Sequence, residues 1–231
     1  MKLLDRRIAV LVAAVLSAAG CSEETDVAPN SPAATAPSTD TTSAGKGGMM
    51  AVPAPEDMVF KDEVTTNTEV PDGLDGLTFV DTQGNRVAIA DYMGKKNVIL
   101  VFTEGFAGML CPFCKTQTSR LVANYDRFAA LDTEILVVYP GERDHLDEFV
   151  EAARTTGKKQ VDQVPFPIVL DEEMTAVDYF SIRSKLAHPS TYVIDKQGKV
   201  RLAYVGADMS ADRPSVKALL EVVQDADKGS E

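Results

Sequence analysis

The spacing of apolar and polar residues divides residues 69–231 into strand-like and helix-like stretches. Nearly continuous apolar runs indicate strands that are covered on both faces, and alternation indicates half-buried strands. Apolar residues that recur at helical spacing indicate amphipathic helices. The strand-like stretches are residues 77–82, 97–103, 134–139, 166–171, 191–195 and 200–205. The helix-like stretches are residues 87–93, 115–131, 144–154, 175–180 and 215–223.

The order of these stretches predicts an α/β fold: a sandwich in which helices flank a central mixed β-sheet. After the entry strand, the order is strand, helix, strand, helix, strand, hairpin and helix. Turn signals at residues 83–85 and 196–199 separate the strands beside them. The length from residue 69 to the end suits one domain with one core.

The N-terminus reads as an export signal rather than as part of the domain. Residues 1–20 combine basic residues, a short apolar run and a small-residue end, which is the pattern of a signal peptide. The run is too short to span a bilayer comfortably. Residues 17–21 resemble the lipobox of bacterial lipoproteins, which implies that Cys21 is lipidated and anchors the protein to a membrane. The alternative is an ordinary secretory signal cleaved near Ala19 or Gly20. Either reading places the protein outside the cytoplasm, on the periplasmic side of the envelope.

Residues 21–68 are expected to tether the domain to the lipidated cysteine. Residues 22–55 are rich in Ser, Thr, Ala, Pro and Gly and contain no aromatic residue. Such a composition buries too little apolar surface to offset the entropy of ordering, so we expect disorder. Residues 58–70 are ambiguous and could form a loose leader.

The chain is acidic, and this narrows the choice of partners. The formal net charge is −12, and removal of a signal peptide with more basic than acidic residues makes it more negative. An acidic surface argues against nucleic acid and against anionic lipid as binding partners.

The strongest chemical signal is the motif Cys111-Pro112-Phe113-Cys114. It follows a buried strand and precedes a helix, so Cys111 is expected at a helix N-terminus, where free backbone amides and the helix dipole favour a thiolate. Pro112 suits the first helical position. We therefore expect Cys111 to be the nucleophile and Cys114 the resolving thiol in thiol–disulfide chemistry. An inert structural disulfide is the alternative. A zinc knuckle lacks a second ligand pair, and a c-type haem would need histidine where Lys115 stands.

At this point the chain resembles the thioredoxin fold, and more closely the peroxiredoxin-like alkyl hydroperoxide reductase/thiol-specific antioxidant (redoxin) family. The resemblance covers roughly residues 69–223. Three segments carry it: residues 98–103 followed by the cysteine motif, the proline segment 189–195 with Gly198, and the entry strand 77–84. It implies a thioredoxin-like sandwich in which Cys111 and Cys114 are catalytic. It also implies that Pro189 faces the active-site disulfide and presents its backbone to substrate.

Departures from the family pattern affect the expected reaction. Peroxiredoxins place Thr or Ser three residues before the peroxidatic cysteine, and this chain has Gly108 there. Where they carry an arginine, this chain has His188 and Pro189. In relatives with the same Cys-Pro-Phe-Cys site, an Arg-Gly pair and a tryptophan lead into it; here Ala107-Gly108 and Leu110 stand in those places. These differences favour dithiol exchange over peroxide reduction.

Several other residues are candidates for supporting roles. Glu104 occupies the place of an acid that, in related enzymes, assists deprotonation of the resolving thiol; a carboxylate that merely faces water is the alternative. His188 could tune the thiolate or carry a proton, or lie exposed in a loop. Phe113 is expected at an apolar rim around the disulfide, or in the core. Arg183 could approach the site from the loop before Pro189.

These observations support three hypotheses. The first is an envelope thiol–disulfide oxidoreductase that cycles Cys111 and Cys114. The second is an antioxidant thiol peroxidase that uses the same pair with a hydroperoxide. The third is a copper-binding assembly module that uses both thiols and His188 as soft-metal ligands. The first two need no cofactor and no metal. They act on a thiol, disulfide or hydroperoxide substrate, and they need an external redox partner because the chain contains no second dithiol domain.

Overall fold

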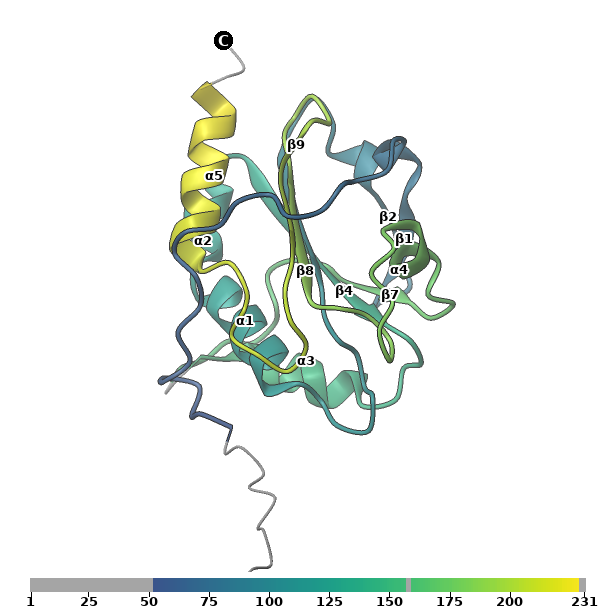
Figure 1. Ribbon diagram of the computed structural model, residues 1–231, viewed down its shortest axis with the longest axis vertical. Helices are drawn as coiled ribbons and strands as arrows, with labels where there is room; N and C mark the ends of the chain where they lie inside the picture. The colour runs from purple at the N-terminus through teal and green to yellow at the C-terminus, as the bar shows by residue number, and fades with distance from the viewer. Residues whose placement is uncertain (1–51, 157–158, 229–231) are drawn as a thin grey trace, which may run out of the picture. The chain divides into compact units, whose positions relative to one another are not determined.

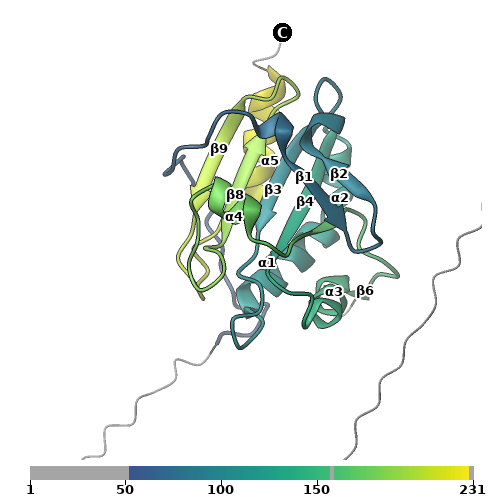
Figure 2. The same ribbon diagram turned by 90° about the vertical axis from the view of Figure 1, so that its right-hand side faces the viewer.

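The computed structural model describes residues 52–156 and 159–228. At the centre of these residues is a seven-stranded mixed sheet. In spatial order its strands are β2 (Arg86–Ala88), β1 (Thr78–Asp81), β7 (Ile168–Asp171), β4 (Thr133–Pro140), β3 (Asn97–Phe102), β8 (Ser190–Ile194) and β9 (Val200–Val205). β4 runs parallel to both β3 and β7, and the other neighbouring pairs are antiparallel. Figure 2 shows β9, β8, β3 and β4 side by side.

Helices cover both faces of the sheet, as Figure 1 shows. One face carries α1 (Pro112–Ala123), α2 (Tyr125–Ala129), α3 (Leu146–Arg154) and α5 (Val216–Lys228). The other carries α4 (Thr175–Tyr179) and the short 3₁₀ turns Leu74–Gly76 and Ile89–Asp91. This is the predicted α/β sandwich of thioredoxin type, with a central mixed sheet and flanking helices.

The two central strands explain why the sheet is covered twice. Every residue of β3 and of β4 is buried. Successive side chains of a strand point to opposite faces, so Ile99 packs into the core beneath α1 and α5, and Leu100 packs into the core beneath α4. The continuous apolar runs in the sequence therefore supply two cores at once.

Local differences from the predicted elements have identifiable causes. Residues 87–93 are not one helical connection, because Val87 pairs with Phe79 and extends a hairpin before the 3₁₀ turn. The predicted helix over 115–131 is interrupted at Asn124, which separates α1 from α2. The small hairpin of β5 (Thr155–Thr156) and β6 (Lys159–Gln160) was not predicted from the sequence.

The N-terminal part of the described chain lies on the domain. Met58 and Phe60, which the sequence analysis assigns to the tether, are buried in the core beneath α1 and α5. Arg120 of α1 donates to the Met58 carbonyl oxygen at 2.7 Å and stacks over the Phe60 ring. Further on, the Asn67 amide donates to the Ala203 carbonyl oxygen on β9. The packed domain therefore begins before residue 69.

The predicted signal peptide, residues 1–20, and Cys21 lie outside the described residues. Within the described ranges, no helix combines the length and the apolar character that crossing a membrane requires.

Candidate active site

Cys111 lies where the sequence places it, at the start of α1. It is the N-cap residue with an extended backbone, and Pro112 occupies the first helical turn. Cys114 follows within the same turn. Both residues are free thiols and both are only 2% exposed. The loop of residues 103–111 joins the carboxyl end of β3 to the start of α1.

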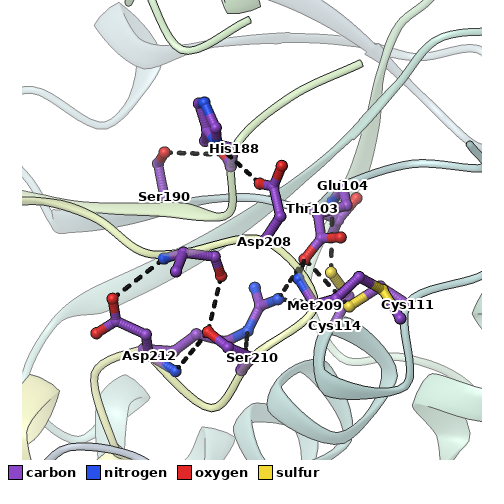
Figure 3. A network of polar contacts seen from close by, with 12 residues as sticks. Thr103, Glu104, Cys111, Cys114, His188, Ser190, Asp208, Met209, Ser210 and Asp212 are labelled. Atoms are coloured by element: carbon purple, nitrogen blue, oxygen red, sulfur yellow. Dashed lines mark hydrogen bonds and ion pairs between the residues drawn. The ribbon is translucent and has the colours of Figure 1, made fainter. Parts of the chain in front are cut away.

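Glu104 reaches both cysteines from the end of β3 (Figure 3). The Cys111 thiol donates to Glu104 Oε1 across 3.2 Å. The backbone N–H of Glu104 donates to Cys114 Sγ at 3.3 Å. Glu104 is 8% exposed, so it is not a carboxylate that merely faces water. The structure thus brings Glu104, Cys111 and Cys114 into one buried cluster.

The cluster also contains Arg213, which sequence reasoning missed. Its Nη2 donates to Glu104 Oε1 at 2.7 Å and to Cys111 Sγ at 3.4 Å, and the residue is 1% exposed. Its Nε donates to the Ser210 carbonyl oxygen, while Nη1 has no acceptor among the described residues. The backbone N–H of Met209 makes a further bond to Glu104 Oε1 at 2.9 Å.

Arg213 comes from the loop between β9 and α5, about a hundred residues beyond the thiols. No local motif marks it, because only the fold of the sheet brings this loop to the start of α1. The one signal in the sequence is a basic residue directly before Pro214, at the entry of the last helix. Arg183, the arginine that the sequence analysis considered, instead pairs with Asp178 at 2.5 Å in an exposed position. It turns to α4, so that interpretation is wrong.

The ionisation of each thiol depends on the other. Burial opposes ionisation of Cys114, but the interaction with Cys111 and the charge of Arg213 outweigh it and lower the pKa of Cys114. Its hydrogen bond with Cys114 and then its burial raise the pKa of Cys111. Thiols that interact this strongly lose their protons as a pair, in two separated steps.

The lowered pKa therefore belongs to Cys114 and the raised one to Cys111, whereas the helix N-terminus alone predicts the lowered pKa at Cys111. The largest cause is the hydrogen bond between the two thiols, which raises the pKa of Cys111 and lowers that of Cys114, whereas the charge of Glu104 raises both. Arg213 keeps its charge in this buried place: burial lowers the pKa of its guanidinium, but the thiols and Glu104 together raise it above its usual value.

His188 and Pro189 contact the loop that follows β9. His188 Nδ1 pairs with Asp208 Oδ1 at 2.7 Å, and none of its described contacts is with a sulfur atom. The Pro189 carbonyl oxygen accepts the N–H of Gly206 at 2.8 Å. Both contacts therefore hold the loop that carries Met209 and Arg213.

Phe113 packs into the core instead of forming a rim. It is 7% exposed and belongs to the same apolar cluster as Leu110, which is 6% exposed. Phe106, in the loop before Cys111, stacks on His145 with ring centroids 3.7 Å apart. Core packing therefore accounts for Phe113, as the alternative interpretation of the sequence allowed.

A pocket of about 410 Å³ adjoins the cluster at Glu104. Its walls come from the 104–109 loop, the 184–186 loop, Asp208 and Met209. Met109 and Met209 are among the few large apolar side chains that are exposed. Methionine adapts its shape to irregular apolar partners, so the pocket suits a small or narrow substrate with an apolar part.

The cluster offers soft-metal donors but does not suit a cation. One ligand atom each from Glu104, Cys111 and Cys114 lies within 4.8 Å of the others. The guanidinium of Arg213 already occupies the position of the counter-charge, 3.4 Å from Cys111 Sγ. A metal ion would face this buried positive charge at close range. His188 is turned to Asp208, so the donor set expected of a copper module is not assembled.

A Cys-x-x-C dithiol at the first turn of a helix, packed on a mixed sheet of this topology, defines a thioredoxin-fold redox protein. The comparison with protein families agrees: the family model described as AhpC/TSA family matches residues 66–203. The chain belongs to this family, and it is an oxidoreductase. Arg213 lies beyond the matched residues.

Individual relatives fall into two functional groups. The chain is 24% identical over 155 residues to a peroxiredoxin of Nanoarchaeum equitans, covering 64% of this chain and 67% of that protein. It is 27% identical over 169 residues to the thiol-disulfide oxidoreductase ResA of Geobacillus thermodenitrificans, covering 72% of this chain and 86% of that protein. The crystal structure of peroxidoxin BcpB from Mycobacterium tuberculosis superposes with a TM-score of 0.54 at 19% identity, covering 69% of this chain and 98% of that one.

Proposed function

We propose that this protein is a dithiol oxidoreductase in which Cys111 and Cys114 cycle between a dithiol and an intramolecular disulfide. The observation that carries the proposal is the buried cluster itself. It holds two thiols at one helix start, one glutamate that contacts Cys111 through its carboxylate and Cys114 through its backbone N–H, and one guanidinium that contacts the carboxylate and Cys111. Such a cluster holds one thiolate and one transferable proton in reach of each other. An inert disulfide would need neither.

The reaction with a disulfide substrate proceeds in two exchanges. Cys111 passes its proton to Glu104 or Cys114 and attacks a substrate sulfur; a mixed disulfide forms, the substrate S–S bond breaks, and the leaving thiolate takes up that same proton, so that Cys114 is a thiolate. The Cys114 thiolate then attacks Cys111 Sγ; the mixed disulfide breaks, and the second substrate sulfur leaves as a thiolate that takes a proton from solvent. The substrate gains two electrons, and the protein becomes the disulfide. An external dithiol partner returns it to the starting state.

A second candidate reaction is the reduction of a small hydroperoxide. Two observations favour it: Glu104, which contacts both cysteines, lines a pocket of small-molecule size, and Arg213 places a guanidinium against Cys111 Sγ. Cys111 would attack the peroxide oxygen; an S–O bond forms, the O–O bond breaks, and an alcohol or water leaves. Attack by Cys114 on the resulting sulfenic acid would expel water and give the same disulfide.

The proposed location is the periplasmic side of the cell envelope, with a lipid anchor at Cys21. This part of the proposal rests on the sequence of residues 1–21. Export would place the dithiol in a compartment where disulfides persist, and return of the Cys111–Cys114 disulfide to the dithiol would require electrons from a redox partner.

The test is the reduction potential of the Cys111–Cys114 pair, followed by addition of hydrogen peroxide to the same sample. We expect a reversible two-electron couple that Cys114→Ser abolishes. Slow reaction with peroxide would identify an exchange enzyme, and rapid sulfenic acid formation at Cys111 would identify a peroxidase. A pair with no reversible couple and no peroxide reaction would overturn both candidates.

A further inference from the structure

The segment that precedes the family-matched domain lies against the loop that carries Arg213. The Lys61 amide donates to the Arg213 carbonyl oxygen at 2.8 Å, and the Ser215 amide donates to the Lys61 carbonyl oxygen at the same distance. Together these bonds form a short parallel bridge between Lys61 and Pro214. The backbone of Arg213 is thus fixed from outside the domain core.

The side chain of Lys61 also binds the loop that carries Arg213. Its Nζ lies 2.5 Å from Asp212 Oδ1 and 2.8 Å from the Tyr204 hydroxyl on β9. Tyr204 also donates to Asp212 Oδ1, and the other oxygen of Asp212 accepts the N–H of Ala207. Hydrogen bonds to Asp212 and then to Tyr204 raise the pKa of Lys61. The contacts close a network that links the N-terminal segment, β9 and the loop.

The other end of this network is the redox centre. Asp212 is the residue before Arg213, whose guanidinium contacts Glu104 Oε1 and Cys111 Sγ. A displacement of the loop backbone therefore moves the one positive charge that lies against the thiols. The family model ends at residue 203 and begins at residue 66, so both Lys61 and Arg213 lie outside it.

We propose that Lys61 is a positioning residue of the dithiol centre: it holds the 206–215 loop so that Arg213 reaches Glu104 and Cys111. This inference rests on the proposed function of the dithiol. It makes the segment before the domain part of the active site, so that whatever displaces residues 58–62 also changes the reactivity of the thiols.

Folding of the segment does not depend on Lys61 alone. Met58 and Phe60 are buried, and Arg120 donates to two carbonyl oxygens of the segment, those of Pro55 and Met58. Replacement of Lys61 by Met keeps the apolar stem and the backbone bonds while removing the charge. The variant therefore separates positioning of the loop from packing of the segment.

The experiment compares Lys61→Met with Lys217→Met in the full chain. Lys217 is exposed on α5, and its ion pairs among the described residues are with Asp62, in the same segment, and with Glu221, not with the loop. The readouts are the pH midpoint of thiolate ultraviolet absorbance, the reduction potential and Tm. In Lys61→Met, the Arg213 guanidinium is held less firmly beside Cys111 and Glu104. It then stabilises the thiolate less and offsets less of the Glu104 charge, so the pH midpoint of thiolate absorbance rises. We expect about a three-fold smaller thiolate-to-thiol ratio at neutral pH, which corresponds to about half a pH unit, and a more negative potential.

Asp212→Asn provides the second arm. It should shift the pH midpoint in the same direction as Lys61→Met. The double variant Lys61→Met/Asp212→Asn should shift the midpoint no further than the larger single change, because both substitutions remove the same ion pair. In an Arg213→Met background, Lys61→Met should have no effect on the midpoint.

Three outcomes would overturn the inference. The first is an unchanged pH midpoint in folded Lys61→Met, and the second is an equal shift in Lys217→Met. The third is a full shift when Lys61→Met is made in the Arg213→Met background. The thiolate midpoint is measured without any turnover. A failure of the proposed enzymatic function would therefore leave this readout intact and would be recognised separately, by the lack of a reversible couple in the wild-type protein.

Discussion

Arg213 Nη2 and Glu104 Oε1 meet at 2.7 Å across a sequence separation of 109 residues, directly beside Cys111 Sγ. Both side chains are almost fully buried, with 2% and 11% of their surface exposed. Burial of a charge is expensive unless a partner of opposite sign accompanies it. The positive charge of Arg213 therefore offsets the negative charge of Glu104, which lies against the Cys111 thiol. As a result, the thiol pair has both a positive and a negative neighbour.

Loss of the guanidinium should be costly for stability. In Arg213→Met, Glu104 remains buried with its charge uncompensated, and we expect the free energy of unfolding to fall by about 3 kcal/mol. Urea unfolding of the reduced protein measures this. Addition of Glu104→Gln to the same variant should restore part of the loss because it removes the stranded charge. A double variant less stable than Arg213→Met would contradict this account.

Neutralisation of Glu104 alone should favour the thiolate. The Glu104 charge raises the pKa of both cysteines. In Glu104→Gln the first midpoint of thiolate absorbance should therefore fall, by about one pH unit for a carboxylate in direct contact. Glu172→Gln is the matched control, since Glu172 forms an exposed ion pair with Arg143. An upward shift would mean that Glu104 acts chiefly as an acceptor that withdraws the proton from Cys111.

The reduction potential should depend on pH in two regimes. Where both thiols are protonated, reduction takes up two protons with two electrons, and the potential falls by about 59 mV per pH unit; with one thiolate present the slope is about 30 mV. Because the pKa of Cys114 is lowered from 9.0, we expect the break below the ordinary thiol pKa. The pKa of Cys111 is raised, so no second break should follow in the alkaline range. A slope that stays at the two-proton value up to pH 9 would show that the thiols are not coupled in this way.

The fold was predictable because its signals are local. The continuous apolar runs over β3 and β4 identify strands covered on both faces, and the helical spacing after Cys111 identifies α1. The errors also have local causes. Residues 87–93 have the composition of a helical connection, yet Val87 pairs with Phe79 in a hairpin. Pairing partners are set by the register of the hairpin rather than by the propensity of single residues.

The active site was predictable only in part, because its charges come from distant segments. Cys111, Cys114 and Glu104 lie within eleven consecutive residues, and a strand–loop–helix pattern is enough to bring them together. Arg213 depends on the path of β8 and β9 and on the loop that follows. The sequence alone reveals neither the position of Arg213 nor the contact of Glu104 with Cys111. The helix dipole was then the only guide, and it predicted a thiolate at Cys111. Electrostatics of a buried pair are decided by such long-range contacts.

Gly206 offers a test of how tightly the Arg213 loop must close. A Cβ atom at this position would lie 1.9 Å from the backbone oxygen of Asp212, which cannot move without the rest of the loop. Gly206 also donates to the Pro189 carbonyl oxygen, so the backbone cannot simply retreat. In Gly206→Ala we expect a loss of about 1–3 kcal/mol in the free energy of unfolding, as for overpacked sites, together with a raised thiolate midpoint because Arg213 is displaced. Gly76→Ala is the control, since a Cβ there meets nothing within 4 Å, and it should change neither quantity. A Gly206→Ala protein that loses stability but keeps the wild-type midpoint would show that Arg213 reaches the thiols without the close packing of this loop.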